Sequence, residues 1–263
     1  MLRYIHLWGN TFIGGYGLMI ALGVVIGVGL GCLVMRRRGY DSDDFLLLSA
    51  YGGLGAMIGA KALFLWTVRD YIDPSRLLDP TYELGALAPA GFVFLGGFCC
   101  GTVLVAVMSR VHGISLSVIL QNGLFALPLA HGFGRIGCFL GGCCYGIPYD
   151  GTFSVTFPED IIPGSVPRFP VQLLSALLLF ILAAVLYLVS RTKHKAAVPW
   201  LYVSLYCIGR FFVEFLRGDS IRGIYWGLSL SQWISLAIGL GTAAFLIWRY
   251  LLPGNRAQGE SSA

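Results

Sequence analysis

Seven long apolar runs constrain the fold of this chain more than any other feature of its sequence. They cover residues 11–35, 45–66, 91–109, 116–134, 170–190, 199–217 and 230–250. A membrane-spanning helix needs about 20 predominantly apolar residues, and each run approaches that length. Because the runs take up more than half of the 263 residues, they leave no room for a separate soluble domain. The sequence predicts an all-α, polytopic membrane protein with seven transmembrane helices and a single domain over residues 1–263.

The composition excludes other classes of protein. Hydrophobic residues make up 57% of the chain and charged residues 12%, against about 45–50% and about 25% in an ordinary soluble domain. These values exclude a soluble globular enzyme, a disordered chain and a nucleic-acid binder. The net charge of +5 comes partly from basic clusters that directly follow apolar runs, at residues 36–38 and 191–195. Charge placed in this way orients a membrane protein and does not identify a ligand.

The basic clusters predict the orientation. Cytoplasmic loops carry an excess of Lys and Arg, which favours an outer N-terminus and a cytoplasmic C-terminus. The first apolar run lacks a positive n-region and an A-x-A cleavage site, so we expect a retained helix. On this topology residues 67–90 and 135–169 are outer segments that cap the site, and residues 253–263 form a cytoplasmic tail. Long segments of this kind commonly carry function, which places the chemistry at the outer face.

Small residues recur at helical spacing in the first two runs. Gly23, Gly27 and Gly31 are four residues apart, and Gly55 and Gly59 repeat that spacing. Small residues at i and i+4 let two helix backbones approach closely in a membrane. We expect these glycines to pack helices and to have no catalytic role.

The sixth run contains ionisable residues, which are costly inside a membrane unless they are paired or hydrated. Arg210, Glu214 and Arg217 lie at i, i+4 and i+7, on one face of a helix. One interpretation is a buried ion pair between Arg210 and Glu214 that fixes helix packing. The other is an anion site, because guanidinium groups match phosphate and the second arginine leaves the cluster net positive.

Arg135 favours the anion site. It lies at the end of the fourth run, within residues 131–146, a stretch with six glycines among sixteen residues. Such a backbone can approach a ligand closely, and N–H groups exposed in glycine-rich turns can bind anions. Since Arg135 and the Arg210 face both lie toward the outer side of the predicted topology, the sequence predicts one phosphate-bearing ligand. A lipid head group with its tails in the bilayer fits this prediction.

Two further polar residues lie within or near the ends of these runs. Lys61, in the second run, either snorkels toward the membrane surface or belongs to the site. Tyr16, near the outer start of the first run, is by default a residue of the interfacial aromatic belt.

Three of the seven cysteines are crowded together, at Cys138, Cys143 and Cys144. Their alternatives are small apolar packing residues or a disulfide with Cys99 or Cys100 on an oxidising outer face. A further alternative is a nucleophilic Cys143 or Cys144, since a nearby Arg lowers a thiol pKa. The spacing lacks C-x-x-C, and His131 alone is a poor complement, so we expect no metal. No cofactor is expected either.

Residues 134–143 resemble the G-R-x-G-N-F-x-N-x-E signature of the prolipoprotein diacylglyceryl transferase family. Further matches are spread over the chain, at residues 16–19, 96–97, 170–173 and 210–217. The resemblance implies transfer of a diacylglyceryl group from phosphatidylglycerol to the lipobox cysteine of a prolipoprotein, with release of glycerol phosphate. The expected partners are phosphatidylglycerol, the prolipoprotein signal peptide and the bilayer, at the outer leaflet of the bacterial inner membrane.

The resemblance also implies functional residues. The expected catalytic residues are Tyr16, Arg135, Arg210 and Glu214, with Glu214 as the base if pairing does not consume its carboxylate. The expected substrate-binding residues are Arg135, Gly137, Cys138, Cys143, Gly146, Gln172 and Arg217.

The chain departs from the family pattern at several polar positions. Leu95 and Phe169 stand where the family has His, Cys138 replaces Asn, and Cys143 and Ser175 replace Glu. A divergent member of this kind is expected to retain the lipid cavity more fully than the chemistry. An altered acceptor, a cysteine-assisted mechanism, a phospholipid-binding protein without turnover and a thiol-redox membrane protein therefore stay open as alternatives.

Overall fold

The computed structural model describes residues 4–6, 12–69, 93–158, 166–218, 224–246 and 248. Regular structure in these ranges is helical apart from two short antiparallel hairpins. The chain divides into two compact units, one of residues 1–34 with 120–263 and one of residues 35–119. The predicted outer segment 67–90 from residue 70 onward, and the tail 253–263, lie outside the described residues.

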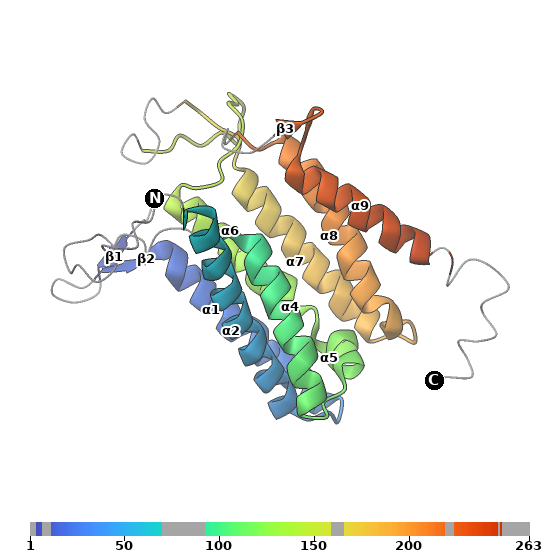
Figure 1. Cartoon of the computed structure of the whole chain (residues 1–263). Helices are drawn as coiled ribbons and strands as arrows, with labels where there is room; N and C mark the ends of the chain where they lie inside the picture. Colours follow the sequence, from blue (N-terminus) through green and yellow to red (C-terminus); the bar gives the residue numbers. More distant parts are fainter. Residues whose placement is uncertain are drawn as a thin grey trace. The chain divides into compact units, whose positions relative to one another are not determined.

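The first unit holds most of the helices. It begins with β1 (Tyr4–His6) and β2 (Phe12–Gly14), paired antiparallel, and continues into α1 (Gly15–Arg37). The later elements are α6 (Ala126–Gly141), α7 (Val171–Ser190), the 3-10 helix η3 (Lys195–Ala197), α8 (Val198–Phe215), the hairpin β3 (Ile224–Tyr225) and β4 (Leu228–Ser229), and α9 (Leu230–Leu246). Helix α7 packs between α6 and α8, and α9 packs on α8 (Figure 1).

Small residues bring α1 and α6 together, as the glycine spacing predicts. A Cβ atom at Gly27 would lie 2.9 Å from the carbonyl oxygen of Ala126, and one at Gly23 would lie 2.7 Å from the Cβ of Phe133. Neither site has room for a side chain without moving a backbone. The predicted packing role of these two glycines is therefore confirmed.

The second unit is built on α2 (Ser42–Thr67) and α4 (Phe94–Val111), which lie side by side (Figure 1). The carboxylate of Asp41 caps α2 by accepting a hydrogen bond from the backbone N–H of Asp43 at 2.7 Å. A Cβ at Gly55 would lie 2.9 Å from the oxygen of Cys100, and one at Gly59 would meet the oxygen of Gly96. The second glycine pair thus packs two antiparallel helices, as predicted.

Among the described residues, four helices are long and apolar enough to cross a membrane: Gly15–Arg37, Ser42–Thr67, Val171–Ser190 and Lys195–Phe215. A fifth candidate span is the pair α5 (Leu116–Gly123) and α6, bent by 54°. Helices over Leu95–Val111 and Leu230–Phe245 are apolar but shorter. The described chain is thus an all-α protein with four to five candidate spans, consistent with a multi-pass membrane protein.

The fourth apolar run differs from a single straight helix. It breaks after Gly123, and α6 then continues through Arg135 to Gly141. Pro128 explains the position of the break, because proline has no N–H and is tolerated only in the first turn of a helix. The restart at Ala126 puts Pro128 in that turn.

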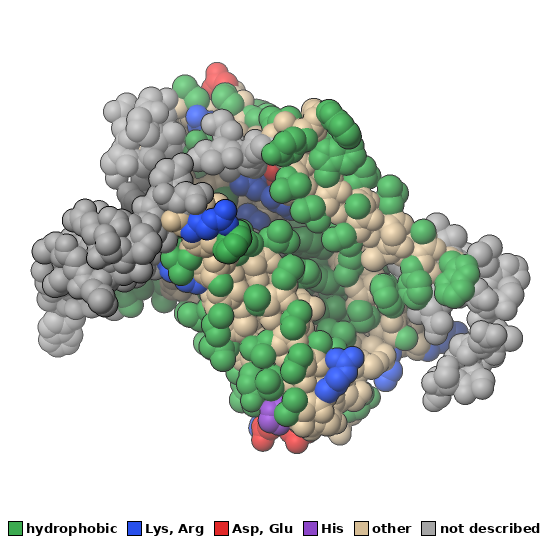
Figure 2. Space-filling model, in the orientation of Figure 1, with side chains coloured by type: hydrophobic (Ala, Val, Ile, Leu, Met, Phe, Trp, Pro, Cys, Tyr) green, Lys and Arg blue, Asp and Glu red, His purple; other side chains and the backbone are tan. Residues whose placement is uncertain are grey.

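Large hydrophobic side chains are exposed along the helices. The exposed fraction reaches 70% at Val25, 65% at Met57 and 64% at Phe212, and hydrophobic side chains are spread over the face seen in Figure 2. A soluble protein rarely exposes so much contiguous apolar surface, whereas acyl chains would cover it in a bilayer. This surface supports the membrane assignment.

Candidate functional site

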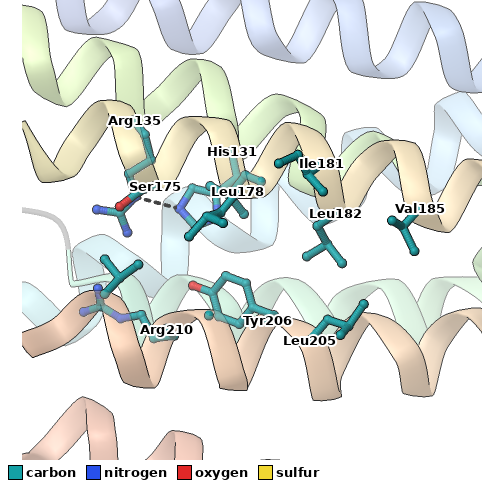
Figure 3. Close-up of a pocket in the computed structure, with 13 residues that line it drawn as sticks. His131, Arg135, Ser175, Leu178, Ile181, Leu182, Val185, Leu205, Tyr206 and Arg210 are labelled. Carbon is teal, nitrogen blue, oxygen red and sulfur yellow. Dashed lines mark hydrogen bonds between the residues drawn. The ribbon is translucent and has the colours of Figure 1, made fainter.

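A cavity of about 210 Å³ lies between α6, α7 and α8 in the first unit. It combines two different environments, as Figure 3 shows. Arg135 from α6 and Arg210 from α8 lie at one end, and apolar side chains of α7 and α8 line the rest. The lining residues are His131, Arg135, Ser175, Leu178, Leu179, Ile181, Leu182, Val185, Leu205, Tyr206, Gly209, Arg210 and Val213.

The polar end is formed by two guanidinium groups from separate helices. Arg135 donates from Nε to Nε2 of His131, one helical turn earlier, at 3.2 Å. Arg210 donates from Nη2 to the hydroxyl of Ser231 on α9 at 3.5 Å. Two guanidinium groups that face one cavity form a site in which both can donate hydrogen bonds to one oxyanion, such as phosphate.

Glu214 connects Arg210 of α8 with Arg217, which lies just after the end of α8. Its Oε2 lies 2.8 Å from Nη2 of Arg210 and 3.5 Å from Nη1 of Arg217, and only 1% of its side chain is exposed. The carboxylate is therefore committed to two ion pairs. The sequence predicted Glu214 as a base only if pairing did not consume its carboxylate. Because both ion pairs are formed, the arrangement favours a positioning role for Glu214.

The apolar part of the cavity extends along α7 and α8 away from the arginines (Figure 3). Leu182 is 7% exposed, and Leu178 and Val185 lie on the same wall. A narrow slot with charge at one end and leucines beyond it matches an amphiphile that has an anionic head and a hydrocarbon chain.

Short backbone pairings hold the loop after α6 against the ends of α7 and α8. Gly146 bridges to Arg217, and Arg168 bridges to both Pro148 and Val155. The guanidinium of Arg168 donates to the carbonyl oxygen of Gly146 at 3.2 Å and lies 4.5 Å from the ring centre of Tyr145. The described residues after α6 thus lie against the start of α7 and the end of α8, and we refer to residues 142–158 and 166–169 as the cap.

Gly137 and Gly146 lie where other backbone segments approach closely, so these positions leave no room for a side chain. A Cβ at Gly137 would lie 3.1 Å from the carbonyl oxygen of Tyr16, and one at Gly146 would meet the oxygen of Phe169. These predicted binding residues therefore shape the site through its backbone. Tyr16 is 47% exposed and packs on α6 beside the cap.

Gln172 ties the start of α7 to the loop after α6. Its Nε2 donates to the carbonyl oxygen of Cys143 at 2.9 Å, and the side chain is buried, with the residue 1% exposed. Within the described chain, Oε1 of Gln172 is buried without a hydrogen-bond partner. A buried carbonyl of this kind normally has a donor, so this position favours a ligand or water that supplies one.

The sulfur atoms of Cys138, Cys143 and Cys144 all lie within 4.8 Å of one another. Cys144 has a φ of 56°, in the left-handed region that a non-glycine residue rarely adopts, so the adjacent Cys143 and Cys144 side chains face one centre. Hydrogen bonds from the other two thiols lower the pKa of Cys144, and the guanidinium groups of Arg217 and Arg135 add to this effect. Hydrogen bonds with Cys138 and Cys144 raise the pKa of Cys143.

Two sequence interpretations need correction. Residues 131–141 belong to helix α6, so their glycines do not form an anion-binding turn, and the N–H groups there are used within the helix. The disulfide with Cys99 or Cys100, one of the alternatives for the clustered cysteines, is also not formed, because all seven cysteines, each within the described ranges, are free. Lys61 lies in the second unit, 5.0 Å from the ring centre of Phe64, and does not line the cavity.

Sequence reasoning missed two residues of the cavity as site residues, His131 and Tyr206. Each lies four residues before a predicted arginine on the same helix, His131 before Arg135 and Tyr206 before Arg210. The i, i+4 rule that grouped Arg210 with Glu214 would have identified both.

Comparisons with known proteins point to one family. A family model described as prolipoprotein diacylglyceryl transferase matches residues 3–248. The chain is 37% identical over 240 residues to a phosphatidylglycerol–prolipoprotein diacylglyceryl transferase of Clostridium tetani, covering 90% of this chain and 93% of that protein. It is 34% identical to the similarly named protein 2 of Clostridium perfringens (93% and 94% covered) and 31% identical to that of Nitrosomonas europaea (91% and 86% covered).

Proposed function

The chain belongs to the prolipoprotein diacylglyceryl transferase family, and we propose on that premise that it transfers the diacylglyceryl group of phosphatidylglycerol to the thiol of a prolipoprotein cysteine. The observation that carries this proposal is the cavity in which Arg135 and Arg210 face a slot of leucines. Phosphatidylglycerol has one phosphate and two acyl chains, so both environments of the cavity have a counterpart in this donor.

The arginines act on the charge that the reaction releases. As the acceptor sulfur bonds to the glyceryl carbon, the bond between that carbon and the phosphate oxygen breaks, and glycerol phosphate departs with an added negative charge. Preorganised guanidinium groups in a water-poor cavity stabilise such developing charge more than they stabilise the bound donor. Arg135 and Arg210 therefore bind the donor and speed its cleavage.

Glu214 positions these groups. Its two ion pairs hold Arg210 and Arg217 at the C-terminal end of α8, and the extra guanidinium leaves the cluster net positive. His131 accepts from Arg135 and restricts its side chain in the same way. Both residues keep the cationic groups aimed at the cavity before the donor binds.

We propose seven spans, with the N-terminus outside and the C-terminus in the cytoplasm of a bacterial inner membrane. The cap, the C-terminal end of α6 and the first turn of α1 at Tyr16 gather at one end of the first unit. The opposite end of α1 carries Arg36 and Arg37. The positive-inside rule puts these arginines in the cytoplasm and therefore puts the cap and the site at the outer leaflet, where the signal peptide of the prolipoprotein arrives.

The test is complementation. A bacterium depleted of its own transferase would be supplied with this chain, and the mass of a reporter lipoprotein would be measured. We expect the mass of the reporter to increase by one diacylglyceryl group, and we expect Arg135→Ala and Arg210→Ala to abolish the increase while still inserting. No increase with well-inserted wild-type protein would overturn the proposal. Co-purified phosphatidylglycerol in that case would instead identify a phospholipid-binding protein without turnover.

A further inference from the structure

We propose that Cys138, Cys143 and Cys144 bind a zinc ion, whose fourth coordination position takes the thiol of the acceptor cysteine. The first part of this inference concerns the chain alone. The second part rests on the proposed transferase function.

The geometry of the three sulfurs carries the metal site. They come from the last turn of α6 and the loop that follows it, and all lie within 4.8 Å of one another. Sulfurs bound to one tetrahedral zinc at about 2.3 Å lie about 3.8 Å apart, so small side-chain rotations complete the site. The sequence argued against a metal because it lacks C-x-x-C spacing. In the structure the fold brings the three sulfurs close together without that spacing.

The charges around the cluster favour a bound cation with thiolate ligands. Three thiolates and one zinc ion carry a net charge of −1. Arg135 lies three residues before Cys138 on α6, about one turn away on the same face, and Arg217 bridges to Gly146, two residues after Cys144. These cations balance the excess negative charge that a zinc ion with three thiolates leaves.

The cluster also leaves room for a ligand. Cys143 is exposed, and Cys138 and Cys144 are partly exposed. Three protein ligands with an open fourth position are typical of a catalytic zinc site, whereas a structural site is closed by four. The amide nitrogen of Gln172 donates to the carbonyl oxygen of Cys143 at 2.9 Å and thereby fixes the backbone of this ligand.

Zinc would supply what the replaced polar residues no longer provide. The acceptor thiol binds zinc in place of water and releases its proton to solvent. A lone pair of the bound sulfur then forms the bond to the glyceryl carbon, the carbon–oxygen bond to phosphate breaks, and its electron pair leaves with glycerol phosphate. The product thioether dissociates from zinc, because it is a weaker ligand than a thiolate. No separate carboxylate base is needed, which agrees with the pairing of Glu214.

The first experiment measures metal without requiring activity. The full-length chain would be purified in detergent under reducing conditions with added ZnSO₄, passed through a desalting column and analysed for zinc by mass spectrometry. We expect about one zinc per chain, lost on substitution of Cys138→Ser, Cys143→Ser or Cys144→Ser and retained in the control Cys99→Ser on α4. Cobalt should give a thiolate charge-transfer band in the wild type.

Alkylation provides a second readout if a variant fails to fold. In the wild type, bound zinc should protect three thiols from iodoacetamide, and a chelator should expose them. No zinc and no cobalt band in reduced, folded protein would overturn the metal site, as would a disulfide within the cluster that forms in place of metal binding.

The acceptor role is tested separately. Removing zinc should lower the transfer rate at least tenfold, and added zinc should restore it. Unchanged transfer after zinc removal would overturn the acceptor role and leave the transferase function in place. Absence of transfer by zinc-loaded protein would instead reject the transferase function, while the zinc content would still stand as measured.

Discussion

Arg135 and Arg210 are each fixed by neighbours before any ligand binds. Arg135 is hydrogen-bonded to His131 at 3.2 Å, and Arg210 is paired with Glu214 at 2.8 Å. Side chains held in this way lose less rotamer freedom when phosphate binds, so more of the interaction energy appears as affinity. The same pairing makes Glu214 a residue on which the site depends without its touching the donor.

Substitution of Glu214→Gln tests this dependence. The change removes the carboxylate that pairs with the largely buried guanidinium groups of Arg210 and Arg217, so we expect a loss of about 2–4 kcal/mol in the free energy of unfolding. Thermal unfolding in detergent would show it as a lower Tm, together with weaker donor binding. The control is Asp150→Asn, an exposed residue of the cap loop, which should leave Tm unchanged. A Tm equal to that of the wild type in Glu214→Gln would show that the carboxylate does not hold the arginines.

At the scale of elements, backbone contact between α2 and α4 depends on glycines. Gly59 faces the backbone of Gly96, whereas Gly53, on the same helix, has open space where a Cβ would be. Alanine is intrinsically a better helix former than glycine by about 1 kcal/mol, so any loss at Gly59 must come from the helix contact.

We therefore predict opposite effects for two matched variants. Gly59→Ala should destabilise the second unit by about 1–3 kcal/mol through overpacking, whereas Gly53→Ala should be neutral or slightly stabilising. Amide hydrogen exchange along α2 and α4 would measure both. Equal protection in the two variants would contradict the close approach of these helices.

Helices with a clear apolar run or i, i+4 spacing could be predicted from the sequence. Features that depend on tertiary contacts could not. The apolar runs and the i, i+4 spacing identified the long helices, the packing glycines and the arginines of the cavity. The break between α5 and α6 was missed because hydropathy does not distinguish one bent helix from a straight one. The gathering of Cys138 with Cys143 and Cys144 depends on the end of α6 at Gly142 and on the left-handed backbone at Cys144, neither of which the cysteine spacing reveals.

At the scale of the whole molecule, the proposal requires the cap to lie outside the cell. Alkaline phosphatase is active only outside the cytoplasm, so fusions report the side of each end. We expect a fusion within the cap loop at residues 150–153 to be active and a fusion after residue 263 to be inactive. A control fusion in the loop at residues 191–195 should also be inactive. An active C-terminal fusion would reverse the proposed orientation.

If guanidinium groups from α6 and α8 bind one lipid phosphate in a single cavity, donor affinity must depend on both arginines. Phosphatidylglycerol retained by purified protein would be quantified for the wild type, Arg135→Gln, Arg210→Gln and the control Arg191→Gln at the far end of α7. Each charge-assisted bond to phosphate contributes about 1.5–3 kcal/mol, so affinity should fall at least tenfold in either cavity variant and stay unchanged in the control. Wild-type affinity in folded Arg135→Gln and Arg210→Gln protein would contradict the account.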